Sequence, residues 1–109
     1  LDVYIWLTYR TYRLDHVASD PAYTVDSSPH PGDGVSQFGG ALGGDMSSGH
    51  IAVVEEVKQD ANGWRIRISE GNYGTNGSGP WEGYNSRWLT QKQFDGAGNV
   101  FFRKKSWKN

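Results

Sequence analysis

The clearest pattern of hydrophobic and polar positions lies in residues 50–72. Residues 50–57, His-Ile-Ala-Val-Val-Glu-Glu-Val, are mostly apolar and rich in β-branched side chains, which is typical of a buried strand. Asn62 and Gly63 follow, and this pair is the strongest short signal for a hairpin turn. In residues 64–68 a tryptophan and two isoleucines alternate with two arginines, which gives the second strand one apolar and one charged side. The segment therefore predicts a β-hairpin with one face turned to a core.

Polar side chains continue the apolar face of the second strand. The alternation carries Glu70 and Asn72 onto the core-facing side, where a carboxylate and an amide are costly unless they are hydrogen-bonded. A tight turn pairs His50 with about residues 73–75, close to both polar groups. The hairpin thus predicts an imidazole beside a carboxylate and an amide, which is the arrangement that orients a catalytic base. The alternative is an ordinary histidine at a strand edge beside a solvated carboxylate.

Outside the hairpin, the patterns predict short elements joined by loops. The apolar residues of segment 1–14 approximate a helical stripe, and we expect a helix there, although the β-branched and aromatic content favours a strand. Residues 15–34 and 73–87 are dense in turn formers and predict loops. The glycine-rich segment 39–44 predicts a flexible surface loop. Short strands are expected at residues 35–38 and 100–103.

The composition indicates one small, β-rich domain. The chain has 109 residues, with 15 Gly and 4 Pro for turns and 5 Trp, 6 Tyr and 4 Phe to fill a core. It contains no cysteine, which excludes disulfides, thiolate metal sites and a thiol nucleophile within these residues. The net charge of −1 argues against a nucleic-acid partner.

Membrane and metal signals are also missing from the sequence. No apolar run approaches the roughly 20 residues that span a bilayer, and nothing resembles a signal peptide. The aspartates lack the regular spacing of a calcium-binding loop. We therefore expect no membrane span, no metal and no cofactor.

The hairpin and its surroundings resemble the CHAP family of cysteine- and histidine-dependent peptidoglycan amidohydrolases and peptidases, which includes phage endolysins. That family has a strand beginning Gly-His-Val/Ile-Ala-Val-Val, and a later strand ends in a Ser/Glu-x-Asn-Tyr/Trp element. The matching segments here are residues 49–55, Gly-His-Ile-Ala-Val-Val-Glu, and residues 68–74, Ile-Ser-Glu-Gly-Asn-Tyr-Gly. Weaker similarities follow in the family's order at residues 23–26, 29–33, 84–87 and 100–103.

The resemblance implies an α+β, papain-like fold with a small antiparallel β-sheet packed against one or more N-terminal helices. Residues 1–109 would form a single domain, whose front part, 1–28, is divergent or incomplete. In the family, a cysteine thiolate attacks an amide carbonyl of peptidoglycan, either as amidase or as endopeptidase. His50 would then be the base, oriented by Glu70 and Asn72. We expect a monomer with bacterial peptidoglycan as partner, and a protein that is secreted, wall-associated or phage-encoded.

The nucleophile is where the chain departs from the family. The family's cysteine begins its first helix in a Cys-Thr-x-Tyr-like context, and the closest stretch here is residues 7–14, Leu-Thr-Tyr-Arg-Thr-Tyr-Arg-Leu. Leu7 would stand at the nucleophile position, and the Thr8 hydroxyl would be one position off. Three functions therefore compete: a hydrolase whose cysteine is missing from this chain, a pseudoenzyme that binds the wall without cutting, and an unrelated SH3-like wall-binding module.

Overall fold

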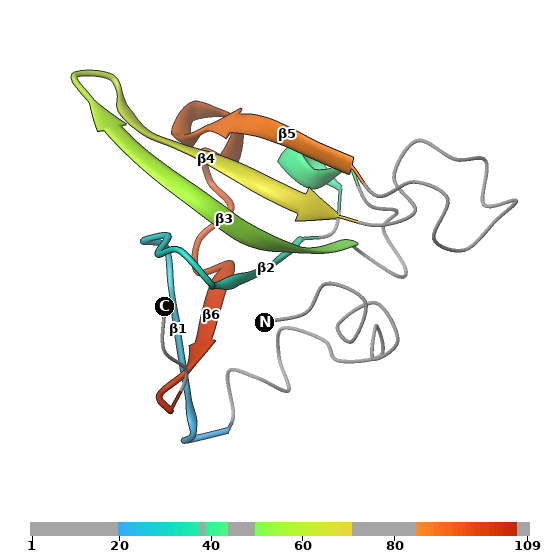
Figure 1. Ribbon diagram of the computed structural model, residues 1–109, viewed down its shortest axis with the longest axis vertical. Coiled ribbons are helices and arrows are strands. Elements are labelled where there is room, and N and C mark those ends of the chain that lie inside the picture. The colour runs from blue at the N-terminus through green and yellow to red at the C-terminus, as the bar shows by residue number, and fades with distance from the viewer. Residues whose placement is uncertain (1–19, 38, 44–49, 71–84, 107–109) are drawn as a thin grey trace, which may run out of the picture.

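A computed structural model describes residues 20–37, 39–43, 50–70 and 85–106 of the chain. These residues form one antiparallel sheet of six strands in the order β1-β6-β2-β3-β4-β5, with two short 3-10 helices, η1 and η2 (Figure 1). The elements are β1 (Tyr23–Asp26), β2 (Gly34–Gln37), η1 (Gly40–Leu42), β3 (His50–Asp60), β4 (Gly63–Glu70), β5 (Asn85–Thr90), η2 (Gln91–Phe94) and β6 (Phe101–Lys104).

The long β3–β4 hairpin dominates the sheet, as Figure 1 shows, and confirms the strongest sequence prediction. Its turn has two residues, because Asp60 pairs with Gly63. Gly63 has a φ of 111°, a conformation that favours glycine, and the Asp60 side chain accepts a hydrogen bond from the Asn62 amide at 2.8 Å. Ile66 and Ile68 are fully buried, as the alternation predicts.

A β-bulge in β3 changes the register that the sequence predicts. Near the turn the pairing is as expected, but it shifts between Val54 and Glu56, and beyond the shift Val54 pairs with Ile68. The predicted pairing of this part of the hairpin is therefore wrong by at least one residue. A one-residue slip exchanges the two faces of a strand. The bulge thus lets Val54 and Val57, three positions apart, both pack on the core side.

The main hydrophobic cluster lies on one face of the sheet and is covered by the two 3-10 helices. Ile51, Val53 and Phe102, on the opposite face, are buried as well. Leu42 of η1 is fully buried and Phe94 of η2 is nearly so. The rings of Trp64, Phe94 and Phe101 pack together with centroid separations of 5.4 to 5.6 Å. The other buried members of this core are Val35, Ala52, Val54, Ile66, Ile68, Leu89 and Val100. The aromatic rings thus fill this core together with leucine, isoleucine and valine side chains.

Several predictions outside the hairpin are corrected or left open. The expected strands at 35–38 and 100–103 correspond to β2 and β6. The prediction of loop at 15–34 is wrong where β1 pairs with β6, and that at 73–87 is wrong where β5 begins. The glycine-rich segment is more than a surface loop, because η1 inserts Leu42 into the core.

The small antiparallel sheet of the expected α+β fold is present. No α-helix occurs within the described ranges, and the helix predicted at 1–14 lies outside them. Over the same ranges, no helix is both long and apolar enough to cross a bilayer.

Candidate active site

Glu70 is the centre of a buried polar cluster at the end of β4. It continues the face of Ile66 and Ile68, so the strand carries its carboxylate inward, and its side chain is 0% exposed. One oxygen, Oε1, accepts hydrogen bonds from His50 Nε2 at 2.8 Å and Arg87 Nη2 at 3.2 Å. The other, Oε2, accepts from Arg87 Nε at 2.6 Å and Asn85 Nδ2 at 2.9 Å. Four hydrogen bonds occupy the acceptor sites of the two oxygens.

His50 reaches this carboxylate from the first position of β3, where it pairs with Gln37 of β2. Its side chain is only 14% exposed. The bulge near Glu55 determines its face, because an unbroken register from the turn would turn His50 to the opposite side from Glu70. The structure thus brings His50 and Glu70 together, although by a different register from the one that the sequence predicts.

Asn85 and Arg87 belong to the cluster and were missed by the sequence reasoning. Both lie on β5, where Asn85 is the cross-strand partner of Glu70 and Arg87 is the partner of Ile68. Directly opposed residues in a sheet share a face, so both side chains point to the side of Glu70. Asn85 and Arg87 stand four and two positions before the buried Leu89, and this spacing of two is the signal that marks their face as the core side.

The cluster keeps the Glu70 carboxylate ionised. Burial raises the pKa of Glu70, but the hydrogen bonds from His50, Arg87 and Asn85 and the charge of Arg87 lower it, and the net pKa lies below its usual value of 4.5. An ionised carboxylate only accepts, so the proton in the His50–Glu70 hydrogen bond belongs to Nε2. In the neutral imidazole, Nδ1 is then the nitrogen that carries no proton and can act as the base.

Two predicted site residues lie outside the described residues. They are Asn72, the second expected orienting residue, and Leu7, the residue at the expected nucleophile position. The catalytic roles of His50, Glu70 and Asn72 therefore stay predictions. Among the described residues, no three His, Asp or Glu side chains are grouped so that they could hold a metal ion.

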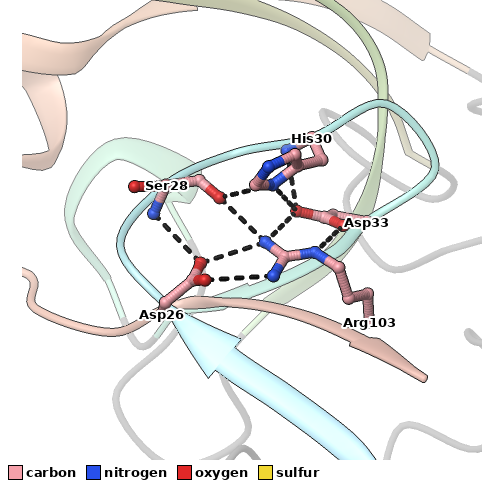
Figure 2. Close-up of polar contacts among 5 residues, drawn as sticks. All are labelled: Asp26, Ser28, His30, Asp33 and Arg103. Carbon is pink, nitrogen blue, oxygen red and sulfur yellow. Dashed lines mark hydrogen bonds and ion pairs between the residues drawn. The ribbon is translucent and has the colours of Figure 1, made fainter. Parts of the chain in front are cut away.

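A second buried carboxylate, Asp33, lies just before β2 and is held by Arg103 of β6 (Figure 2). Arg103 donates to both Asp33 oxygens, from Nε at 2.7 Å and from Nη2 at 2.8 Å. It also donates to both oxygens of Asp26 at 3.0 Å and to the Ser28 carbonyl. The His30 ring beside it binds the Ser28 carbonyl through Nδ1 at 3.0 Å and lies 3.8 Å from Asp33. This cluster ties the ends of β1, β2 and β6 together.

Comparison with known proteins agrees with the geometry of the hairpin. The family model described as the CHAP domain matches residues 2–72, nearly two thirds of the chain. The match includes His50 and Glu70 and ends at Asn72, before Asn85 and Arg87. Searches of the curated proteins and of the solved structures found no match. The family match, together with the paired His50 and Glu70, identifies the chain as a member of the CHAP domain family.

Proposed function

We propose that this domain has the site of a hydrolase of peptidoglycan amide bonds, with His50 as general base and Glu70 as the group that orients it, and that the thiol nucleophile is missing from these residues. The CHAP family to which the chain belongs is one of peptidoglycan hydrolases. The observation that carries the proposal is the 2.8 Å hydrogen bond from His50 Nε2 to the fully buried Glu70. A histidine held by a carboxylate on one nitrogen presents the other nitrogen for proton transfer.

The proposed chemistry is a Cys–His acyl transfer in which this chain supplies the base. A thiol loses its proton to His50 Nδ1, and the thiolate attacks the amide carbonyl. The imidazolium then returns the proton to the leaving amine as the C–N bond breaks, while the Glu70 carboxylate stabilises the positive charge of the imidazolium through Nε2. A water molecule that loses its proton to His50 hydrolyses the thioester so formed, and the thiol is restored. Asn72 is proposed as a second orienting group. Because the 109 residues include no cysteine, they lack the thiol that this chemistry needs.

The missing thiol favours a second candidate, in which the domain binds peptidoglycan but does not cut it. Leucine at position 7 has no nucleophilic atom, and the hydroxyl of Thr8 stands one position away from the expected nucleophile position. In this candidate the His50–Glu70 cluster is retained as part of a binding surface. Either function would place the protein at the bacterial wall, as a secreted, wall-associated or phage-encoded protein.

Restoring the thiol tests the proposal. The loss of turbidity of a bacterial wall suspension is measured for the natural chain and for its Leu7→Cys variant. We expect no clearing by the natural chain and clearing by Leu7→Cys. A thiol one position further on, in Thr8→Cys, and a thiol without its base, in the double variant Leu7→Cys/His50→Ala, are the matched controls, and neither should clear the suspension.

Sedimentation of the natural chain with insoluble peptidoglycan separates the two candidates. Binding without clearing by any of the cysteine variants supports the binding function. If the natural chain does not bind peptidoglycan and none of the cysteine variants clears the suspension, both candidates are contradicted. If Leu7→Cys clears the suspension, mass spectrometry of the soluble fragments distinguishes an amidase, which frees whole stem peptides from the sugar, from an endopeptidase, which cuts within the peptides.

A further inference from the structure

We propose that Arg87, assisted by Asn85, is a positioning residue that holds Glu70 charged and oriented toward His50. The proposal rests on the function proposed for His50 and extends the site to β5. This strand lies beyond the residues that the CHAP family model matches. Neither Arg87 nor Asn85 is proposed to touch the substrate. They are proposed to act through Glu70, on the nitrogen of His50 that performs the proton transfer.

The geometry of Arg87 is that of a two-bond clamp. Its Nε and Nη2 donate to the two different oxygens of Glu70, which fixes the plane of the carboxylate as well as its position. Asn85 adds a hydrogen bond to Oε2, whereas His50 binds Oε1. With the plane fixed, Oε1 is the oxygen that remains turned to His50 Nε2.

The clamp is itself anchored. Nη2 of Arg87 also donates to the carbonyl oxygen of Leu42 at 2.9 Å. Leu42 is the fully buried residue of η1, so this oxygen has a fixed position in the core. The guanidinium therefore binds Glu70 through Nε and Nη2 and the covering 3-10 helix through the same Nη2. A lysine, which offers a point charge instead of a planar fork, cannot make the same set of bonds.

The charge of Arg87 is as important as its shape. Glu70 is fully buried, and burial alone favours the protonated carboxyl. The groups that face it are His50 from β3, Asn85 and Arg87 from β5 and, through Arg87, the Leu42 carbonyl from η1. Arg87 is the permanent cation of this set. Without it, Glu70 would hold a proton more readily, and its support of a positively charged His50 would weaken.

The test follows the titration of Glu70 directly, by carbon-13 NMR of its side-chain carboxyl in the natural chain and in Arg87→Gln. We expect the Glu70 midpoint to rise by about one to three pH units in Arg87→Gln, because an adjacent opposite charge lowers a carboxyl pKa by about that amount. Arg87→Lys should give a smaller rise, since it keeps the charge but loses the fork. The hydrogen-bonded Nε2 proton of His50, followed by nitrogen-15 NMR, should exchange faster with water in both variants.

Two control variants separate positioning from simple loss of stability. Arg65→Gln removes an exposed arginine of the same sheet, and Ile66→Val removes one buried methylene from the core beside the site. Neither should move the Glu70 midpoint or the exchange of the His50 proton. If Arg87→Gln does not fold, Arg87→Lys and the milder Asn85→Ala take its place, and both should move the same two signals.

An unchanged Glu70 midpoint and unchanged His50 exchange in the folded Arg87 variants would overturn the positioning role. These signals require no cysteine and no substrate, so they are independent of the wall assay. If Leu7→Cys fails to clear walls but Arg87→Gln moves both signals, the proposed hydrolysis fails and the action of Arg87 on the imidazole stands. If Leu7→Cys clears walls and the signals do not move, the hydrolysis stands and the positioning role fails.

Discussion

The part of the chain that the structure describes contains two buried carboxylates, Asp33 and Glu70, each clamped by one arginine and each with a histidine nearby. Of these two, Glu70 has the geometry of a reactive site. Asp33 with Arg103 and Glu70 with Arg87 are alike in that both carboxylates are 0% exposed and both arginines use two nitrogens. The difference lies in the histidine. His30 is half exposed and binds a backbone carbonyl, whereas His50 binds the carboxylate itself and is 14% exposed.

The same arrangement, a buried carboxylate bound by an arginine, serves two purposes in this molecule. The Asp33 side chain accepts hydrogen bonds from Arg103 and from the backbone amide of His30, the latter at 2.8 Å. The Asp33 cluster therefore connects chain segments. At Glu70 one acceptor position is taken by the imidazole of His50, which donates from Nε2 at 2.8 Å. A buried Arg–carboxylate pair is thus a structural element by itself. It becomes part of the proposed site where the carboxylate also accepts a hydrogen bond from a histidine ring, as Glu70 does from His50.

Removing Arg103 should have the largest effect on stability. Arg103→Gln leaves the buried Asp33 charge without its main partner and releases Asp26, and we expect a loss of about 3–5 kcal/mol in the free energy of unfolding. Urea denaturation followed by tryptophan fluorescence measures this loss. Lys104→Gln, at the exposed neighbouring position, is the control. A loss below about 1 kcal/mol would mean that the Arg103 cluster does not hold the ends of β1, β2 and β6 together.

Removing the charge of Glu70 should have a smaller effect that depends on pH. Because the pKa of Glu70 is lowered on folding, its charge stabilises the fold above pH 4.5, its usual value, and this contribution is lost as the pH falls through the lower, folded value. Glu70→Gln should therefore cost about 1–3 kcal/mol at pH 7, and the difference from the natural chain should shrink toward pH 3.

Urea denaturation at about pH 7, 5 and 3 measures the difference in unfolding free energy between Glu70→Gln and the natural chain. The exposed carboxylate of Asp95 provides the control, since Asp95→Asn should leave the unfolding free energy within about 0.5 kcal/mol of the natural value at neutral pH. A Glu70→Gln cost that stays constant from pH 7 to pH 3 would show that the Glu70 charge is not stabilised by the fold.

Removing His30 should have the smallest effect on stability, and its comparison with His50 should give the sharpest contrast in activity. His30→Ala removes a half-exposed ring bound to a backbone oxygen, and we expect a change of at most about 0.5 kcal/mol in unfolding free energy. In the Leu7→Cys background it should leave wall clearing unchanged, while His50→Ala should abolish it. Loss of clearing with His30→Ala would contradict the assignment of the base function to His50 alone.

The sequence predicts the parts of this fold that depend on neighbouring residues. The turn at Asn62 and Gly63 and the alternation that carries Glu70 inward are local patterns, and both agree with the structure. The bulge near Glu55 left no such signal, because residues 51–54 are apolar throughout and have no period that identifies a face. The register of that part of the hairpin was therefore predicted wrongly.

The site was predictable only as far as one hairpin extends. His50 and Glu70 lie on adjacent strands of the same hairpin, so pairing rules bring them close. Asn85 and Arg87 reach Glu70 from β5, and nothing in residues 84–90 specifies which strand they pair with. The Arg103 cluster joins positions about 70 residues apart, and such a contact follows from the complete sheet and not from any local pattern.

The bulge in β3 has a consequence for how the hairpin can vary in length during evolution. His50 and Glu70 are 20 positions apart, and the bulge makes an even separation the one that puts them on the same face. A single inserted or deleted residue between them would turn the histidine away from its carboxylate, unless a second change compensated for it. In relatives that keep this pair, we therefore expect length differences between the two residues to occur in multiples of two, whatever the composition of the turn.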